Sequence, residues 1–261
     1  MDHKHKSHAT AAGVLVALGI IYGDIGTSPL YVMQAIIGDA PINQQTVLGG
    51  LSCIFWTLTL QTTLKYVILI LRADNRGEGG IFALFALVRR HAKWLTLPAI
   101  IGGAALLADG IITPPISVSS AIEGLRMLKM KDGSPMVTDT VPIVMIILTV
   151  LFIIQIFGTK IVGRFFGPVM TIWFGMLGLT GLLWIENDWS ILRAISPYYA
   201  YDLLTSHTAG SAGFWTLGAV FLCTTGAEAL YSDLGHCGRE NIRISWVFVK
   251  AYGSQLLDNE G

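Results

Sequence analysis

Six long apolar stretches decide what this chain can fold into. Each is close to the roughly 20 mainly apolar residues that an α-helix needs to cross the hydrocarbon core of a bilayer. They predict an all-α membrane protein, because helices satisfy their own backbone hydrogen bonds where no water is present. The third stretch is long enough to tilt or to extend past the membrane, and a seventh, short one begins near Asn241. The predicted spans are residues 13–37, 46–71, 96–125, 141–158, 164–185 and 213–232.

The composition agrees with residence in a membrane. Charged residues make up 13% of the chain and apolar residues 53%, whereas about a quarter of a soluble protein is charged. The 17 basic residues balance the 17 acidic ones, and no basic stripe is present, which argues against a nucleic-acid partner. Cys53, Cys223 and Cys237 are an odd number without CxxC spacing, and are therefore predicted to be small core residues.

The distribution of Lys and Arg between the spans predicts the orientation. Eleven of them fall on the side of the N-terminus and four on the other side. This excess favours a cytoplasmic N-terminus, so that residues 1–12 form a cytoplasmic tail. His3, His5 and His8 are then interpreted as residues of a solvated tail and not as a metal site. Lys65 and Lys250 lie near span ends, where they can snorkel, and are left out of the count.

Three acidic residues, Asp24, Asp109 and Glu228, fall near the middle of predicted spans. An acid at the centre of a bilayer costs about 2.5–3.5 kcal/mol on insertion scales. No Lys or Arg is placed by the sequence near the centre of a span to neutralise them. The acids therefore have to be protonated, hydrated or bound to a cation. Neutral carboxylic acids that hydrogen-bond neighbouring helices are an alternative to the cation site.

Hydroxyl groups accompany the acids at helical spacing. Asp109, Thr113 and Ser117 are four residues apart and share one helix face. Pro114 and Pro115 follow Thr113 and are expected to interrupt the hydrogen-bond ladder and free carbonyl groups there.

The other two acids also have oxygen-bearing neighbours. Thr225 and Glu228 are three residues apart, and Asp24 and Tyr31 are seven apart. Oxygen is the ligand that hard alkali and alkaline-earth cations prefer. A zinc site is not indicated, because the chain has no His/Cys cluster and no HExxH.

Two of the acids stand beside residues that weaken helices. Gly23 and Gly26 flank Asp24, and Pro29 follows; Gly226 precedes Glu228. Irregular backbone at membrane depth is tolerated where it is buried in protein or lines a polar cavity. We therefore expect breaks in the first and sixth helices, which in transporters built of two inverted repeats mark the binding site.

Several long motifs resemble the KUP/HAK/KT family of potassium uptake transporters. They follow the family pattern in order and cover most of residues 13–250. The motifs are GIIYGDIGTSPLYVMQAI, RADNRGEGGIFAL, DGIITPPISVSSAIEGL, YYA and TGAEALYSDLGHCGRENIRISWVFVK.

The resemblance implies a LeuT/APC-type inverted-repeat fold of about twelve helices with a cytoplasmic C-terminal domain. This chain would hold the first five-helix repeat, helix six and the start of helix seven, with helices one and six broken. Members carry potassium inward across the plasma membrane, driven by the proton gradient. The implied partners are potassium ions, protons and the lipid bilayer, and no cofactor or enzymatic activity is implied. Pairing of two copies through the C-terminal region is an option that the resemblance leaves open.

The resemblance also implies roles for individual residues. The family's potassium-binding positions fall on Asp24, Tyr31, Asp109, Thr113, Ser117, Thr225 and Glu228. Because burial disfavours a charged carboxylate without its cation, Asp24 and Glu228 are also candidates for the coupled proton.

The last residues, 251–261, depart from the family pattern as AYGSQLLDNEG. We expect a truncated or off-family tail after a transmembrane domain at 13–250, so that the chain is an incomplete transporter. A non-transporting membrane sensor or an inactive fragment is the alternative. An intramembrane aspartyl protease would need a YD and a GxGD motif on its helices, and the acids here read YGDIG and LLADGIIT.

Overall fold

The computed structural model describes residues 9–38, 42–89, 93–125, 128, 139–156, 159–185, 189–205 and 213–253. Within these residues the chain is mostly helical and holds no strand, which confirms the all-α prediction. The histidines of the N-terminal tail and residues 254–261 lie outside the described part.

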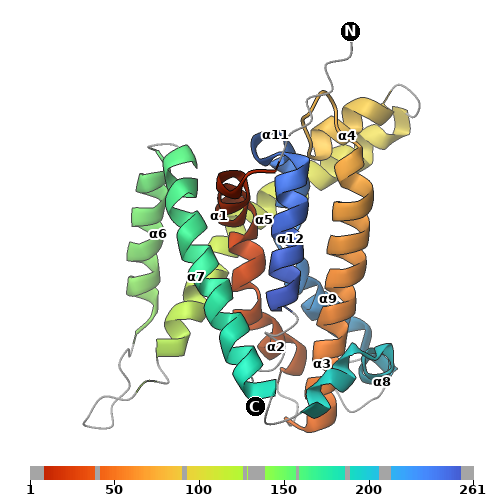
Figure 1. Ribbon diagram of the computed structural model, residues 1–261, viewed down its shortest axis with the longest axis vertical. Helices are drawn as coiled ribbons and strands as arrows, with labels where there is room; N and C mark the ends of the chain where they lie inside the picture. The colour runs from red at the N-terminus through yellow and green to blue at the C-terminus, as the bar shows by residue number, and fades with distance from the viewer. Residues whose placement is uncertain are drawn as a thin grey trace.

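The first helix, α1 (Ala11–Thr27), lies at the centre of the bundle (Figure 1). It packs along α7 (Thr159–Ile185) and α12 (Arg239–Gly253), which come from distant parts of the chain. Tyr22 is fully buried there, and its hydroxyl donates a hydrogen bond of 3.1 Å to the carbonyl of Ile242 in α12. The main hydrophobic core therefore forms around the apolar first helix.

The second predicted span is one helix of changing pitch. It covers Gln44–Arg72, 29 residues, and is long and apolar enough to cross a membrane. The segment begins as α3 (Gln44–Thr57), widens to a π-helix at Leu58–Leu69 and tightens to a 3₁₀-helix at Ile70–Arg72. The short α2 (Pro29–Ile37) joins it to α1.

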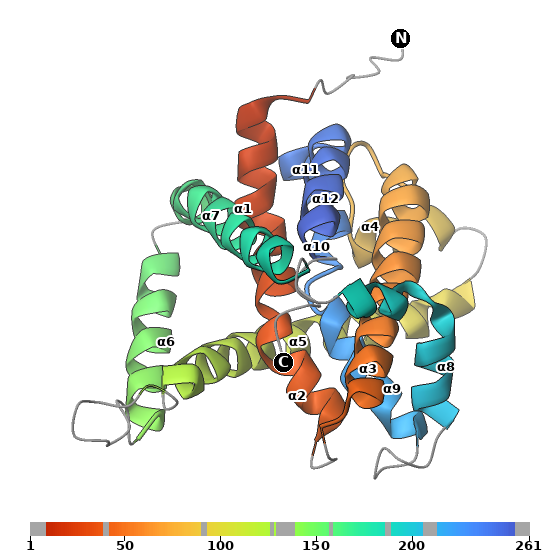
Figure 2. The same cartoon turned by 60° about the horizontal axis from the view of Figure 1, so that its bottom comes forward.

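The third predicted span, α5 (Thr96–Gly124), crosses the bundle obliquely from the side of α3 to that of α6 (Figures 1 and 2). A helix of 29 residues is about 43 Å long, so it exceeds a hydrocarbon core of about 30 Å unless it tilts. Pro114 and Pro115 lie inside this helix, which continues to Gly124 as the predicted span 96–125 requires. Because they have no N–H, the ladder lacks their two bonds. Short helices at Ile81–Val88 (α4) and Lys93–Leu95 precede it.

Apolar side chains cover much of the outer surface of α5, α6 (Val141–Gln155) and α7. Ile111, Ile146 and Ile172 are 74%, 64% and 72% exposed. Such surface suits contact with lipid, and Lys93–Gly124 and Phe166–Leu183 join Gln44–Arg72 as helices long and apolar enough to span a membrane. The apolar helices at Ala11–Gly23 and Val141–Ile154 are shorter.

The sixth predicted span is interrupted. It runs as α9 (Gly213–Phe221) and a 3₁₀ turn at Leu222–Thr224, and resumes as α10 (Ala229–Ser232). Two further short helices, at Trp189–Ile195 and Pro197–Thr205 (α8), pack across α3, and α11 (Leu234–Cys237) leads into α12. The three cysteines are free and buried, which confirms their prediction as core residues.

Candidate functional site

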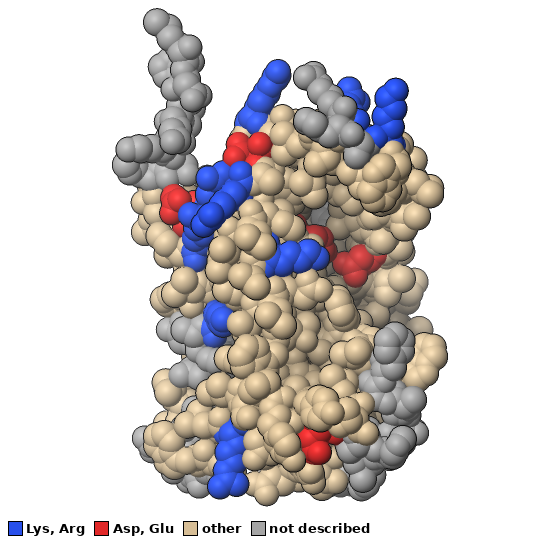
Figure 3. Space-filling model, turned by 90° about the vertical axis from the view of Figure 1, so that its right-hand side faces the viewer, with Lys and Arg blue, Asp and Glu red and all other residues tan. Residues whose placement is uncertain are grey.

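A pocket of about 490 Å³ lies where four distant segments meet. The face of the molecule that carries α3 and α4 is hollowed, and acidic side chains lie there beside a basic one (Figure 3). The pocket joins the π-helix, the start of α4, the middle of α5 and the interrupted sixth span. Its polar and small lining includes Lys65, Tyr66, Gly80, Asp109, Thr224, Thr225, Glu228, Tyr231 and Ser232.

The backbone of the sixth span is shaped by Gly226. Thr225 leaves the helix with φ −56° and ψ 131°, and Gly226 follows at φ 84°. Residues with a Cβ rarely adopt this left-handed region, so glycine permits the turn. The helix resumes at Ala229. The break predicted at Gly226 is therefore present, and it carries Thr225 and Glu228 into the pocket lining.

The first span is interrupted before Pro29, one of the predicted positions, and not at Gly23 or Gly26. Helix α1 continues through Gly23 and Gly26 to Thr27, so the unwinding predicted around Asp24 is absent. The interruption lies at Ser28, which itself has helical angles of φ −53° and ψ −38°, and Pro29 begins α2. Proline lacks the N–H that would continue the ladder, which explains a discontinuity at this point. The side chain of Asp24 lies outside the described part of the structure.

Gly26 serves packing and not unwinding. A Cβ added there would lie 2.7 Å from Met170 Cε and 2.8 Å from Phe174 Cζ, so its absence lets α7 approach α1. The indole Nε1 of Trp173 donates a hydrogen bond of 2.9 Å to the carbonyl of Gly26. The close contact with α7 thus stabilises the helix in spite of its glycines.

The acid of α5 and the hydroxyl one turn later interact as the spacing predicts. Thr113 is buried, and its hydroxyl donates a hydrogen bond of 3.0 Å to Asp109 Oδ1. Ser117 continues the same face, but its Oγ lies 3.4 Å from Thr27 Oγ1 at the end of α1. Asp109 faces the pocket, whereas Ser117 belongs to the junction of α1 and α5.

Tyr31 lies at a second polar position near this junction. Its hydroxyl is 3.3 Å from Ser28 Oγ, and both residues are buried. Neither Tyr31 nor Ser117 lines the pocket. Of the predicted site residues, the structure therefore brings Asp109, Thr225 and Glu228 together and places Tyr31 and Ser117 elsewhere.

Lys65 belongs with these acids, although no motif in the sequence places it there. Its position near the end of the second predicted span suggests a snorkelling side chain, yet Lys65 lines the same pocket as Asp109 and Glu228. Its ammonium lies 5.1 Å from the centroid of the Tyr66 ring. The place of Lys65 about two helical turns inside the predicted span is the one sequence feature that indicates a position in the pocket. The lining thus combines two carboxyl groups with one amine.

The fold and the pocket define an α-helical integral membrane protein with a polar site at a helix break. More narrowly, the chain belongs to the potassium transporter family, because residues 11–256 match the domain described as the K+ potassium transporter integral membrane domain. The match confirms the predicted family and reaches beyond Lys250. The family consists of transporters and not of enzymes.

Individual relatives are similar over nearly the whole chain. The probable potassium transport system protein Kup of Cytophaga hutchinsonii is 61% identical over 100% of this chain and 41% of its own length. The Kup proteins of Flavobacterium psychrophilum and Lactococcus lactis subsp. lactis are 65% and 56% identical over 95% and 100% of this chain. The chain thus spans about two fifths of the relatives it matches. No solved structure matches it.

Proposed function

We propose that this chain forms the first part of the ion pathway of a potassium uptake transporter, with potassium bound at the pocket beside the interrupted sixth span. The observation that carries the proposal is the meeting of Asp109, Thr225 and Glu228 around the left-handed turn at Gly226. Carboxylate and hydroxyl oxygens at a helix break are the groups that can replace the water around a hard cation. The names of the relatives indicate potassium as that cation.

The proposed potassium ligands form two groups. Asp109 and Glu228 supply charge, while Thr225 and the hydroxyl of Thr113 supply neutral oxygens next to them. Tyr31 and Ser117 are proposed as further contributors from the junction of α1, α2 and α5, and Asp24 is proposed as a contributor from its sequence pattern alone. Stripping water from potassium is offset only by several well-placed oxygens, so the spacing of these groups would set the preference over sodium.

Coupling to protons follows from the two acids of the pocket. An ionised carboxylate in a dehydrated site is unfavourable unless a positive charge accompanies it. Lys65 lines the same pocket. When its ammonium extends to water at the span end, potassium at Asp109 and a proton on Glu228 neutralise both acids together, so the closed site is favoured when both ions are bound. This is the requirement for K⁺/H⁺ symport with alternating access. Asp24 is the second candidate for the proton.

The wider architecture is proposed on the same basis. The interruption of the sixth span supports a LeuT/APC-type inverted repeat, in which broken helices meet at the midplane of the membrane. Most Lys and Arg side chains on one face gather toward the end of the molecule where α4 lies (Figure 3). This asymmetry supports a cytoplasmic position for that end, and with it for the N-terminus.

The test is rubidium uptake at acidic and neutral pH in bacteria that lack their own potassium importers. The chain is expressed alone and as residues 1–250 joined to the remainder of the Cytophaga relative. We expect uptake by the extended protein that is stronger at acidic pH. Uptake by the chain alone would show that its own helices suffice, and absence of uptake by both would favour the non-transporting sensor.

Substitutions assign the roles of the acids. In the extended protein, Asp109→Asn is expected to raise the half-saturating rubidium concentration about tenfold, because one charged ligand is lost. Glu228→Gln is expected to weaken the dependence of uptake on pH more than rubidium binding. Glu123→Gln, near the end of the same helix α5 and outside the pocket, is the matched control. Unchanged affinity in Asp109→Asn would exclude this residue as a ligand.

A further inference from the structure

We infer that Asp74 and Arg239 are positioning residues for this pocket, because their ion pair fastens the loop 73–80 to the segment 229–239 that follows Glu228. The inference rests on the proposed function for its role in transport. The two segments, called here the clasp, contain residues that neither the predicted spans nor the predicted ion ligands explained.

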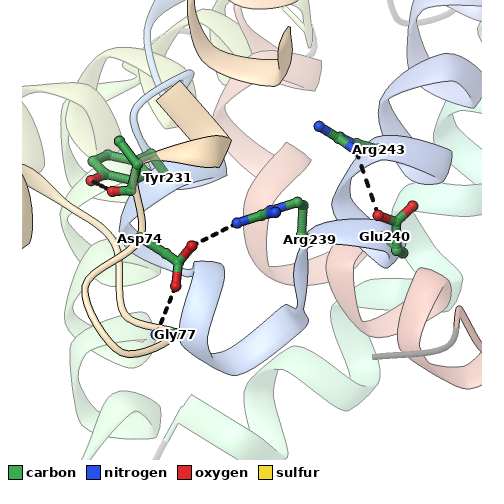
Figure 4. A network of polar contacts seen from close by, with 7 residues as sticks. Asp74, Gly77, Tyr231, Arg239, Glu240 and Arg243 are labelled. Carbon is green, nitrogen blue, oxygen red and sulfur yellow. Dashed lines mark hydrogen bonds and ion pairs between the residues drawn. The ribbon is translucent and has the colours of Figure 1, made fainter. Parts of the chain in front are cut away.

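The ion pair is the first contact of the clasp. Arg239 Nη2 lies 2.7 Å from Asp74 Oδ1, although the two residues are 165 positions apart in the chain. The other carboxylate oxygen of Asp74 accepts a hydrogen bond of 3.0 Å from the backbone N–H of Gly77 (Figure 4). Asp74 is therefore fixed by its own loop while it holds the start of α12.

A second set of contacts lies next to the ion pair. The hydroxyl of Tyr231 donates a hydrogen bond of 2.5 Å to the carbonyl of Ala73. Gly79 lies directly against the carbonyl of Tyr231, and the carboxylate of Glu78 lies against Gly235. A Cβ at Gly79 would collide with the backbone of Tyr231, so the two backbones approach closely at this end of the loop, whereas a Cβ at Gly235 would meet only the end of the Glu78 side chain, which can shift.

The loop has a fixed shape of its own. Asn75 and Glu78 exchange backbone hydrogen bonds of 2.9 and 3.1 Å around Arg76 and Gly77. These two central residues have φ of 57° and 87°, the pattern of a type I′ turn. A preformed turn presents Asp74 without further ordering, so the ion pair can form and break as one unit.

The clasp adjoins the pocket directly. The N–H of Tyr231 donates a hydrogen bond of 3.0 Å to the carbonyl of Glu228, one helical turn earlier. Gly80 and Ile81 from the loop side, and Tyr231 and Ser232 from the other side, line the pocket beside Glu228. Separation of the clasp would therefore displace the wall that carries the acid.

The ion pair suits a contact that opens. Each of its side chains is 34% exposed, and ion pairs that are open to water contribute little to global stability. Its loss is expected to loosen the segment 229–239, which the Tyr231 contacts still hold, and to leave the fold intact. Because Thr225–Glu228 is not helical, this segment can turn relative to α9 at little cost to regular structure.

The neighbouring ion pair provides a matched control. Arg243 Nη1 lies 3.5 Å from Glu240 Oε1, three residues earlier on the same helix α12 (Figure 4). This pair has similar chemistry and is close to the clasp, but it joins no two segments. Glu240→Gln removes a charge next to the clasp and leaves the contacts between its two segments in place.

The first test measures opening of the clasp without transport. In a Cys53→Ala, Cys223→Ala background, Cys237 is the only cysteine left, and it is 5% exposed against the core around α1. Asp74→Asn is expected to raise its rate of modification by a maleimide about threefold in open membranes, the size of effect typical of a partly exposed ion pair. The exchange Asp74→Arg with Arg239→Asp should restore the slow rate. Equal rates in Asp74→Asn and Glu240→Gln would overturn the clasp.

The second test measures the effect on the pocket. In the extended protein, Asp74→Asn is expected to raise the half-saturating rubidium concentration about threefold, with rescue by the charge exchange and no change in Glu240→Gln. A lower maximal rate without rescue would indicate a merely structural role and overturn the positioning role. If no version takes up rubidium while the maleimide result holds, the proposed function fails and the clasp stands.

Discussion

The interruptions of the first and sixth spans look alike in the sequence and differ in the structure. Both combine glycine with an acid, as GDIG in one and GAE in the other. The first remains an α-helix to Thr27, whereas the second leaves the helix at Thr225 and resumes at Ala229. Glycine next to an acid is therefore not enough to break a helix.

The difference lies in what surrounds each glycine. Along the first span, Met170, Trp173 and Phe174 of α7 pack against Gly26, and such contact outweighs the roughly 1 kcal/mol that a helical glycine costs. At Gly226 the backbone takes a left-handed conformation that no ordinary residue adopts cheaply. Packing against α7 keeps the first glycine-rich segment helical, whereas the left-handed backbone at Gly226 interrupts the second.

Replacement of Gly226 is expected to have the largest effect on this contrast. Gly226→Ala places a Cβ at φ 84°, which costs about 1–2 kcal/mol and favours a closed helix. We expect a thermal midpoint several degrees lower in detergent, and loss of rubidium uptake by the extended protein. A variant with the parent's midpoint and uptake would mean that the left-handed turn is not required.

Replacement of Gly26 tests the packed side of the comparison. The added methyl group of Gly26→Ala would meet Met170 Cε and Phe174 Cζ, which are the ends of side chains and can shift in part. We expect destabilisation of about 1 kcal/mol, measured by thermal unfolding. A second change, Met170→Ala, should recover part of this loss by making room. Failure of that recovery would place the strain in the backbone.

Replacement of Gly23 should act in the opposite direction. It lies in the same helix, and a Cβ added there would find nothing within 4 Å. Gly23→Ala is therefore expected to stabilise the protein by about 0.5–1 kcal/mol through helix propensity. A lower midpoint in this variant would show that the first span does need a flexible residue beside Asp24.

The smallest expected effect concerns the chain after the sixth span. Burial raises the pKa of the Asp233 carboxyl above its ordinary 3.8, and His236, 3.9 Å away, partly offsets this. Folding thus favours the protonated form of Asp233. The stability that this protonated acid contributes is fully present below pH 3.8 and is lost as the pH rises through the raised pKa. At neutral pH, Asp233→Asn should raise the free energy of unfolding, measured by thermal unfolding, relative to the parent by less than about 1 kcal/mol, and this gain should vanish in acid. A gain independent of pH would exclude this cause.

Much of the fold could be predicted because a bilayer imposes simple rules on a sequence. The length and apolar character of Gln44–Arg72, Lys93–Gly124 and Phe166–Leu183 specify helices whatever their neighbours are. Helical spacing likewise predicted the bond between Thr113 and Asp109, because both lie on one uninterrupted helix. The free, buried cysteines followed from composition and spacing in the same way.

Other features depended on contacts between distant segments, which no local pattern encodes. The sequence by itself determined the helical membrane class, the family and the identity of the acids. Only the tertiary structure decided that Glu228 meets Asp109 beside Lys65, that α7 holds the first span together at Gly26, and that Asp74 pairs with Arg239. The physical reason is range: hydrophobic length and helical periodicity act within one segment, whereas a pocket or an ion pair between segments exists only after the helices have packed.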